Sequence, residues 1–257
     1  MARIIALANQ KGGVGKTTTA INLGASIAAC ERKVLVVDID PQANATSGLG
    51  FPKDGSNGSM YPVLVDGRPI HEVIRESELP GLYVASSAPD LVGAEIELAD
   101  VESREFRLAS ALDIARGEFD YILIDSPPSL GLLTVNALAA ADSVLIPIQC
   151  EYFALEGVSQ LLDTVERVRR SLNPSLAIEG IVMTMADDRI NLSRQVIDEA
   201  RSYFGSTVFE TTIPRNVRLG EAPSFGQPIL LYDIRSRGSE AYVKLAKELI
   251  ERVEKQP

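Results

Sequence analysis

The stretch KGGVGKT, residues 11–17, decides the fold of this chain. It follows a short apolar run, residues 3–8, and precedes an alanine-rich stretch, residues 15–29, with the composition of a helix. Glycines let the backbone turn tightly with its N–H groups pointing inward, and the helix that follows adds partial positive charge. A strand, a glycine-rich turn and a helix in this order predict a loop that binds the phosphates of a nucleotide.

The stretch departs from the usual pattern G-x-x-x-x-G-K-[ST], because Gln10 stands at the first glycine position. The physical requirements are still met. We expect the Lys16 ammonium to reach the β- and γ-phosphates of ATP, the Thr17 hydroxyl to ligate Mg²⁺, and the Thr18 hydroxyl to bind the α-phosphate. The residues predicted to bind the nucleotide here are Lys11, Gly12, Gly13, Val14, Gly15, Lys16, Thr17 and Thr18.

Two further apolar runs end in aspartates. Residues 33–37 lead into Asp38 and Asp40, which alternate along an extended chain and therefore project to the same side. Residues 121–124 lead into Asp125, which is followed by the sequence Ser-Pro-Pro. Because ligands of parallel sheets bind at the carboxyl ends of the strands, these carboxylates are predicted to lie beside the phosphate loop. We expect Asp38 to lie near the magnesium ion and Asp125 to hold it through a water molecule.

Apolar runs alternate with helical stretches along the chain. Strands separated by helices give a doubly wound α/β fold, a mostly parallel sheet with helices on both faces. We expect one P-loop ATPase domain over residues 1–257, with a surface loop at residues 52–69, which are rich in Gly, Ser, Pro and Asp. The predicted strands are 3–8, 33–38, 82–86, 121–125, 143–148, 177–183 and 208–211; the predicted helices are 15–29, 101–116, 132–140, 155–172, 193–204 and 239–253.

Composition and charge narrow the function classes. The formal net charge of -10 excludes a uniformly basic surface, so any DNA contact has to come from a local patch. The two cysteines, Cys30 and Cys150, lack the spacing of a zinc site or a disulfide framework. No apolar run is long enough to span a bilayer and no secretory leader is expected, so the sequence predicts a cytoplasmic protein.

Three runs of sequence resemble one protein family: ALANQKGGVGKTTTAINL at 6–23, which contains KGGVGKT, DIDPQANATSGLG at 38–50 and IPRNVRLGEAP at 213–223. They are similar to the deviant Walker A ATPases of the ParA/MinD group, and most similar to the chromosomal ParA (Soj) branch. Lys11 matches the family's signature lysine, which acts across an ATP-sandwich homodimer. Asp40 matches the switch I aspartate, which helps to position the attacking water. The resemblance thus implies ATP hydrolysis with Lys11, Lys16 and Asp40 as catalytic residues.

The resemblance also implies ligands for the later part of the chain. Pro214 and Asn216 match residues that border the adenine, and Arg189 and Arg218 match arginines that bind DNA without sequence preference in the ATP dimer. It implies a slow ATPase that acts in chromosome or plasmid segregation, cytoplasmic and associated with the nucleoid. Its partner would be a ParB-type centromere-binding protein, whose basic segment would suit a chain of net charge -10.

Three alternatives stay open. A MinD-like switch would dock on a membrane, but the apolar stripe within residues 242–253 has ordinary core spacing, so stable membrane association is not expected. A redox or amide-forming enzyme on this fold is less favoured, because Cys30 and Cys150 do not supply the paired ligands of a bridging iron–sulfur cluster. A ParA-like ATPase that positions another cargo would share every residue named above.

Overall fold

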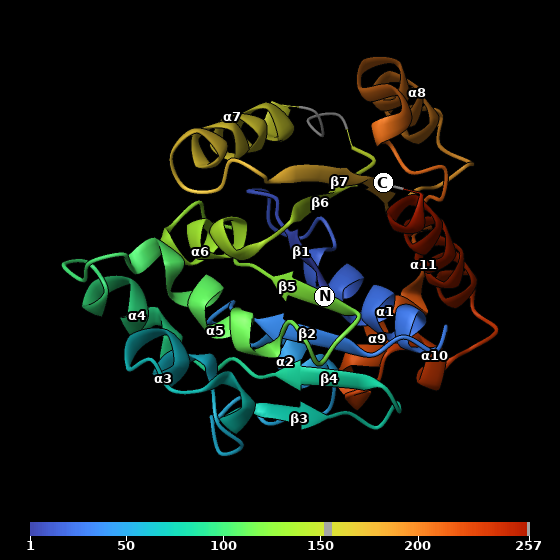
Figure 1. Cartoon of the computed structure of the whole chain (residues 1–257). Helices are drawn as coiled ribbons and strands as arrows, with labels where there is room; N and C mark the ends of the chain where they lie inside the picture. Colours follow the sequence, from blue (N-terminus) through green and yellow to red (C-terminus); the bar gives the residue numbers. More distant parts are fainter. Residues whose placement is uncertain (152–155, 256–257) are drawn as a thin grey trace.

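The computed structural model describes residues 1–151 and 156–255. One seven-stranded sheet of order β3-β4-β2-β5-β1-β6-β7 runs through the described chain, parallel except for β3, which pairs antiparallel with β4 (Figure 1). The strands are β1 Arg3–Leu7, β2 Val34–Asp38, β3 Ile74–Glu76, β4 Leu82–Ala85, β5 Tyr121–Asp125, β6 Ser143–Gln149 and β7 Ala177–Thr184.

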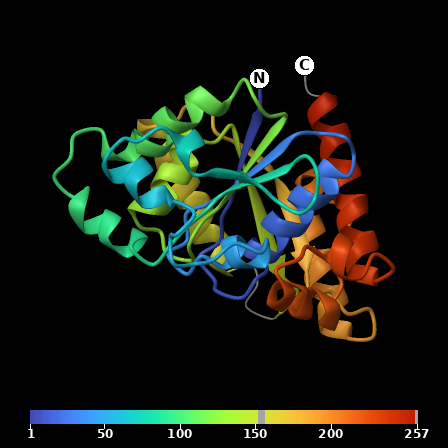
Figure 2. The same cartoon turned by 90° about the horizontal axis from the view of Figure 1, so that it is seen from below.

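Helices cover both faces of the sheet. Figure 2 shows α1 and α11 on one side of the strands, with α3, α4, α5 and α6 on the other. The α-helices are α1 Lys16–Ala28, α2 Asn44–Gly48, α3 Met60–Val65, α4 Leu91–Glu97, α5 Arg107–Ala115, α6 Leu132–Ala140, α7 Glu156–Ser171, α8 Asn191–Phe204, α9 Val217–Glu221, α10 Ile229–Tyr232 and α11 Arg237–Glu254. Short 3-10 helices are η1 Ile70–Glu72, η2 Arg104–Phe106, η3 Gly205–Thr207 and η4 Ala222–Phe225.

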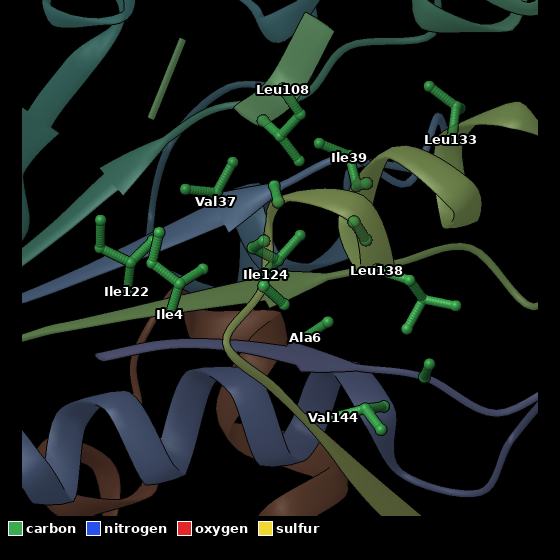
Figure 3. Packing of buried hydrophobic residues seen from close by; sticks show 14 of the residues in the cluster. Ile4, Ala6, Val37, Ile39, Leu108, Ile122, Ile124, Leu133, Leu138 and Val144 are labelled. Carbon is green, nitrogen blue, oxygen red and sulfur yellow. The ribbon is translucent and has the colours of Figure 1, made fainter. Parts of the chain in front are cut away.

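The core consists of two layers because successive side chains of a strand point to opposite faces of the sheet. In β1, Ile4 and Ala6 pack in the layer below α6 with Leu138, as Figure 3 shows. Ile5 and Leu7 pack in the other layer, against α1 and α11. With β1 buried on both faces and paired on both edges, its carboxyl end is a fixed platform for the loop that follows.

The structure confirms the doubly wound α/β fold and corrects several predicted elements. Residues 52–69 are not all loop, because α3 forms where Met60, Val63 and Leu64 are buried in the core. The helix predicted at 101–116 begins as η2 and becomes α-helical only at Arg107. Residues 208–211 form no strand, since Val208 makes a single bridge to Ile181. The predicted start of the 155–172 helix lies outside the described residues. None of the described helices combines the length and apolarity needed to cross a bilayer.

Candidate nucleotide site

The phosphate-binding loop lies between the end of β1 and the start of α1, at the carboxyl edge of the sheet. Gly13 and Gly15 have φ angles of 74° and 91°, a left-handed backbone that favours glycine. Gly15 immediately precedes α1, so the N-terminus of that helix opens into the loop. The glycines therefore place backbone N–H groups and the positive end of a helix around one point, as phosphate binding requires.

Hydrogen bonds to distant strands hold the loop in shape. Asn9 Nδ2 donates to the carbonyl of Pro147 in β6 at 2.7 Å, and Asn9 Oδ1 accepts from the Lys11 N–H at 3.0 Å. Thr184 Oγ1, at the end of β7, donates to the carbonyl of Val14 at 2.7 Å. The loop is thus formed before a nucleotide arrives, which reduces the entropy lost on binding.

Lys16 is buried beneath the loop. Its side chain is 6% exposed, and its ammonium donates to the carbonyls of Asn9 at 2.9 Å and Lys11 at 3.4 Å. Burial lowers the pKa of Lys16, and the carboxylates of Asp125 and Asp40 oppose that shift. An ammonium that rests on backbone carbonyls in a buried site is ready to exchange them for phosphate oxygens.

Asp38 ends β2 at the centre of a buried network. Its Oδ2 accepts from the N–H and the hydroxyl of Thr46 at 2.8 Å and 2.7 Å, and its Oδ1 accepts from the Asp40 N–H at 3.1 Å. Burial raises the pKa of Asp38 to about 6, while the bonds from Thr46 and Asp40 act in the opposite direction. Ser87 extends the network, because its N–H donates to Thr46 Oγ1 at 2.8 Å and its hydroxyl to the Asp40 carbonyl at 2.7 Å.

Asp125 ends β5 between β1 and β2, in register with Leu7 and Asp38. It is fully buried, and neither carboxylate oxygen accepts a hydrogen bond of ordinary geometry among the described residues, although the Thr17 hydroxyl lies close enough to favour the charged form. Burial raises the pKa of Asp125 well above its usual range; Asp38 and Asp40 add to this shift, whereas the Thr17 hydroxyl and the Lys16 ammonium partly offset it. A buried carboxylate with unused oxygens indicates a ligand of positive charge.

These residues fit a magnesium ion that arrives with the nucleotide. No group of three or more His, Cys, Asp or Glu side chains in the described chain is placed to hold a metal ion alone. Mg²⁺ in nucleotide sites takes few protein ligands and fills its octahedron with waters and phosphate oxygens. The unused oxygens of Asp125, with Asp38 and Thr17 beside them, suit that mode of binding.

Asp40 is buried within the site, whereas Lys11 lies on its outer side. Asp40 is 7% exposed, and its Oδ1 accepts from the Gln42 N–H at 2.9 Å. The Lys11 side chain is 39% exposed, and its ammonium lies 3.6 Å from a carboxylate oxygen of Glu151. Arg215 approaches the same carboxylate at 3.8 Å. Lys11 therefore lies on the rim of its own phosphate loop, in contrast to the buried Lys16.

A cavity of about 360 Å³ opens beside the loop. Pro214 and Asn216 both line it, next to Gly15 and Thr18 of the phosphate loop and its helix. Asn216 Oδ1 accepts from the Arg218 N–H at 2.8 Å, an N-cap of α9 that fixes the amide plane. The cavity thus adjoins the phosphate loop on the side where a base would lie.

The two arginines predicted to bind DNA lie on adjoining segments and are both ion-paired. The segments run side by side at a bridge between residues 186 and 214. Arg189 has an 88% exposed side chain and pairs with Asp187 at 2.7 Å. Arg218 is 54% exposed and lies between Glu221 at 2.9 Å and Asp233 at 3.5 Å. Carboxylates of the chain itself therefore neutralise both guanidinium groups.

Sequence reasoning missed the residues that position the site. Asn9, Thr46, Ser87 and Thr184 each donate one of the bonds described above. Thr46 had a signal, because it lies inside the run 38–50 that carries the resemblance. Asn9 had the same kind of signal, because it lies inside the run 6–23. Thr184 had none, since its partner Val14 is distant in the sequence and spacing does not reveal such a pair.

A buried lysine in a glycine-rich loop at a helix N-terminus, with carboxylates at the ends of two neighbouring strands, defines a P-loop nucleotide-binding protein. Comparisons with known proteins agree. Residues 2–178 match the family described as an AAA domain (AAA_31). The chain is 58% identical to the chromosome partitioning protein ParA of Myxococcus xanthus over 252 residues, which cover 98% of this chain and 89% of that protein.

Two further similarities identify the family within the P-loop proteins. The chain is 57% identical over 249 residues to the sporulation initiation inhibitor protein Soj of Bacillus subtilis, covering 97% of this chain and 98% of that protein. A solved structure of cobyrinic acid a,c-diamide synthase from Mycobacterium smegmatis, with bound ADP and magnesium, has a TM-score of 0.88 at 35% identity and covers 100% of this chain and 97% of that one. The chain belongs to the ParA/Soj family of chromosome-partitioning ATPases, as the resemblance implied.

Proposed function

We propose that this ParA-type ATPase is a switch that binds Mg-ATP, dimerises, binds DNA without sequence preference and is reset by hydrolysis. One observation carries the nucleotide part of the proposal: the buried Asp125 carboxylate accepts no hydrogen bond of ordinary geometry in the described chain and lies beside the buried Lys16. Mg-ATP satisfies both, because the metal neutralises the carboxylates and the phosphates receive the ammonium. The chain acts as one ATPase domain.

The phosphate loop has the first role in this cycle. Backbone N–H groups of Gly12, Gly13, Val14 and Gly15 cradle the phosphates, and Lys16 pairs with the β- and γ-phosphates. Thr17 ligates the magnesium ion directly and Thr18 bonds the α-phosphate. Asp38 and Asp125 hold the waters of the ion, which, when bound, neutralises charge that develops on the phosphates. Pro214 and Asn216 border the adenine.

Hydrolysis requires a positioned water and charge compensation at the γ-phosphate. Asp40 positions the water; its burial next to Lys16 and the bond from Ser87 to its backbone carbonyl support this role. Lys11 reaches the phosphates bound by a second copy of the chain; its exposed position on the loop rim supports this role. With a lysine as the added charge, hydrolysis is slow and a partner accelerates it. That partner is a ParB-type centromere-binding protein.

DNA binds to the ATP dimer through Arg189 and Arg218. Their exposed side chains lie on adjoining segments, and dimerisation doubles the patch. Contacts confined to phosphates need only a few arginines and give strong dependence on salt. Because the net charge of the chain is -10, DNA contacts only the local patch that contains these arginines. The ATP form is thus associated with the nucleoid in the cytoplasm.

The test measures binding to a random-sequence DNA duplex with ATP, with ADP and without nucleotide, each at two salt concentrations. ATP-dependent binding that weakens steeply with salt is the expected result. Binding that is equal in all three nucleotide states, or absent in all three, overturns the DNA part of the cycle. The ATPase assignment is tested separately by phosphate release.

The similarity to a protein called cobyrinic acid a,c-diamide synthase offers one alternative, an ATP-dependent amide synthesis. Identity to that protein is 35%, against 58% and 57% to the two chromosome-segregation relatives, and this difference favours the switch. One assay of ATP consumption distinguishes the two functions. The switch hydrolyses ATP with water alone, whereas an amide-forming enzyme consumes ATP only when its acid substrate and a nitrogen donor are both present.

A further inference from the structure

Ser87 lies just after β4, a strand that contributes none of the residues assigned above to ATP. Its hydroxyl donates to the carbonyl of Asp40 at 2.7 Å, and its N–H donates to the Thr46 hydroxyl oxygen at 2.8 Å. These partners are 47 and 41 residues away in the sequence. One residue at the end of β4 therefore holds both ends of the segment 40–46, which carries the switch I aspartate.

The bond from Ser87 to Thr46 continues to Asp38. The Thr46 hydroxyl donates its proton to Asp38 Oδ2 at 2.7 Å, so its oxygen is left to accept the N–H of Ser87. The Thr46 N–H donates to the same carboxylate oxygen at 2.8 Å. Two bonds to one oxygen fix the plane of the Asp38 carboxylate, and the bond from Ser87 fixes that plane relative to β4.

These bonds form in a site that is closed to water. Asp38, Thr46 and Ser87 are fully buried. The loss of a bond is costly in such a place, because no water replaces the missing partner. Ser86 is buried next to Ser87, but its hydroxyl has no hydrogen-bond partner among the described residues. Of these two neighbouring hydroxyls, only that of Ser87 is linked to the nucleotide site.

The position in which Asp40 is held is beside the ammonium of Lys16. Burial lowers the pKa of Lys16, whereas the nearby carboxylates of Asp125 and Asp40 raise it. Asp40 is therefore within electrostatic reach of the group that receives the phosphates. A misplacement of about 1 Å can slow catalysis roughly 100-fold, so a loosened Asp40 backbone affects turnover more than binding.

We propose that Ser87 is a positioning residue for ATP hydrolysis, which holds the Asp40 backbone through its hydroxyl and the Asp38 carboxylate through Thr46. This inference rests on the proposed function, in which Asp40 positions the attacking water. Ser87 acts through these residues and not on the nucleotide. Removal of its hydroxyl therefore lowers the rate of hydrolysis and leaves the affinity for Mg-ATP nearly unchanged.

The test compares Ser87→Ala, which removes the hydroxyl and keeps the N–H, with Ser86→Ala. Ser86→Ala is the matched control, because it removes a neighbouring buried hydroxyl that has no partner in the described part of the chain. Phosphate release at saturating Mg-ATP gives the turnover number, and calorimetric titration gives the affinity. Amide hydrogen exchange over residues 40–47 of the nucleotide-free chain measures how firmly the segment is held, independently of hydrolysis. Ser87→Ala is also combined with Asp40→Ala.

We expect turnover to fall about tenfold in Ser87→Ala, with an affinity for Mg-ATP within about twofold of the wild-type value and faster exchange over residues 40–47. Ser86→Ala is expected to match the wild-type chain in all three measurements. In the Asp40→Ala background, Ser87→Ala is expected to cause no further loss, because a residue that acts through Asp40 has no effect once that carboxylate is absent.

A conservative pair of variants tests the path through Thr46. Thr46→Val removes the hydroxyl that links Ser87 to Asp38, and we expect the Mg²⁺ concentration for half-maximal hydrolysis to rise about tenfold. Thr46→Ser keeps the hydroxyl and is expected to restore the wild-type requirement. An equal requirement for Mg²⁺ in both variants overturns this part of the inference.

Three results overturn the role of Ser87 in positioning Asp40. They are wild-type turnover or exchange in Ser87→Ala, a fall in turnover that is matched by an equal fall in affinity, and a further loss in the Asp40→Ala background. If Asp40→Ala has its expected effect and Ser87→Ala has none, only this inference is rejected. If Asp40→Ala hydrolyses ATP at the wild-type rate, the proposed role of Asp40 is rejected and the inference with it.

Discussion

The phosphate site and the two arginine segments differ in the burial and the partners of their charged side chains. At the phosphate site, the Asp125 carboxylate is buried and accepts no hydrogen bond of ordinary geometry in the described chain, and Lys16 rests on backbone carbonyls. In the arginine segments, Arg189 and Arg218 are exposed and each is already paired with carboxylates of the chain. The first region has the carboxylates of Asp38, Asp40 and Asp125 against the ammonium of Lys16 and so lacks positive charge, whereas the second has its counter-charges in place.

This difference predicts two kinds of binding. A preformed site with unbalanced buried charge binds its ligand tightly and specifically, because the ligand supplies what the protein lacks. Exposed arginines have to exchange one set of partners for another, so each contributes little and the binding depends on salt. The four predictions below test this contrast, from the largest expected effect to the smallest.

Lys16→Ala is expected to abolish nucleotide binding. The ammonium is the positive charge on the β- and γ-phosphates, and its loss is predicted to weaken ATP binding roughly 100-fold. Calorimetric titration with Mg-ATP measures the effect, and dimerisation and DNA binding are expected to disappear with it. ATP affinity close to that of the wild-type chain would show that the loop does not bind phosphate as assigned.

Asp40→Ala is expected to separate binding from hydrolysis. The side chain positions the attacking water and does not hold the nucleotide, so ATP binding and DNA binding persist while turnover falls roughly 100-fold. Single-turnover phosphate release gives the rate, and the titration above gives the affinity. Hydrolysis at the wild-type rate would contradict the switch I assignment.

Asp125→Asn is expected to stabilise the nucleotide-free protein. Buried carboxyls with raised pKa values bind protons more tightly in the folded than in the unfolded chain, so for these groups the free energy of unfolding falls as the pH rises. For Asp38, whose pKa is about 6, the fall begins near the unfolded value of about 4 and ends near 6. The neutral amide cannot take on the charge that Asp125 acquires when the pH exceeds its raised pKa, and above that pH we expect the midpoint of thermal unfolding to be higher in the variant, on the order of 5 °C.

Two controls accompany this measurement. The stabilisation is expected to shrink as the pH is lowered and the wild-type carboxyl takes up a proton, and to reverse in saturating Mg-ATP, which stabilises only the wild-type site. An Asn variant that is less stable than the wild-type chain without nucleotide, at a pH above the raised pKa, would show that Asp125 has a satisfying partner in solution.

Arg218→Ala is expected to weaken DNA binding about tenfold while ATP-driven dimerisation persists. The slope of affinity against salt concentration should become shallower by about one for each lost phosphate contact. Glu221→Gln is the matched variant, because it removes a partner of Arg218 and leaves the arginine in place. We expect DNA binding about twofold tighter in that variant. Loss of dimerisation in Arg218→Ala would remove this residue from the DNA-binding role.

The same contrast explains which site residues could be predicted from the sequence. The sequence predicted where the phosphate loop and three aspartates, Asp38, Asp40 and Asp125, lie. Each is at or just after the end of a buried strand, so the order of strands and helices along the chain is enough to place it at one edge of the sheet. Thr184 and Asn9 were not predicted, because their partners, Val14 and Pro147, are distant in the sequence and the contacts form only in the tertiary structure. The function of exposed arginines depends on surroundings that no local pattern specifies.

Short elements of the fold were also difficult to predict from the sequence. The central strands were predicted well, because continuous apolar runs between helices specify buried parallel strands. The antiparallel β3, with Arg75 and Glu76 exposed, was missed, because its pairing with β4 is determined by the neighbouring strand and not by its own composition. Helix α3 was predicted as loop, because glycine and proline dominate the residues around it.

The central position of β1 has a consequence for synthesis on the ribosome. β1 emerges well before both strands that pair with it, β5 and β6. The loop after it is then held by Pro147 and Thr184. The phosphate loop therefore lacks its tertiary partners until β6 and β7 have been synthesised. We expect affinity for ATP to appear only after residue 184 has been added, so nucleotide binding distinguishes chains that include β7 from shorter ones.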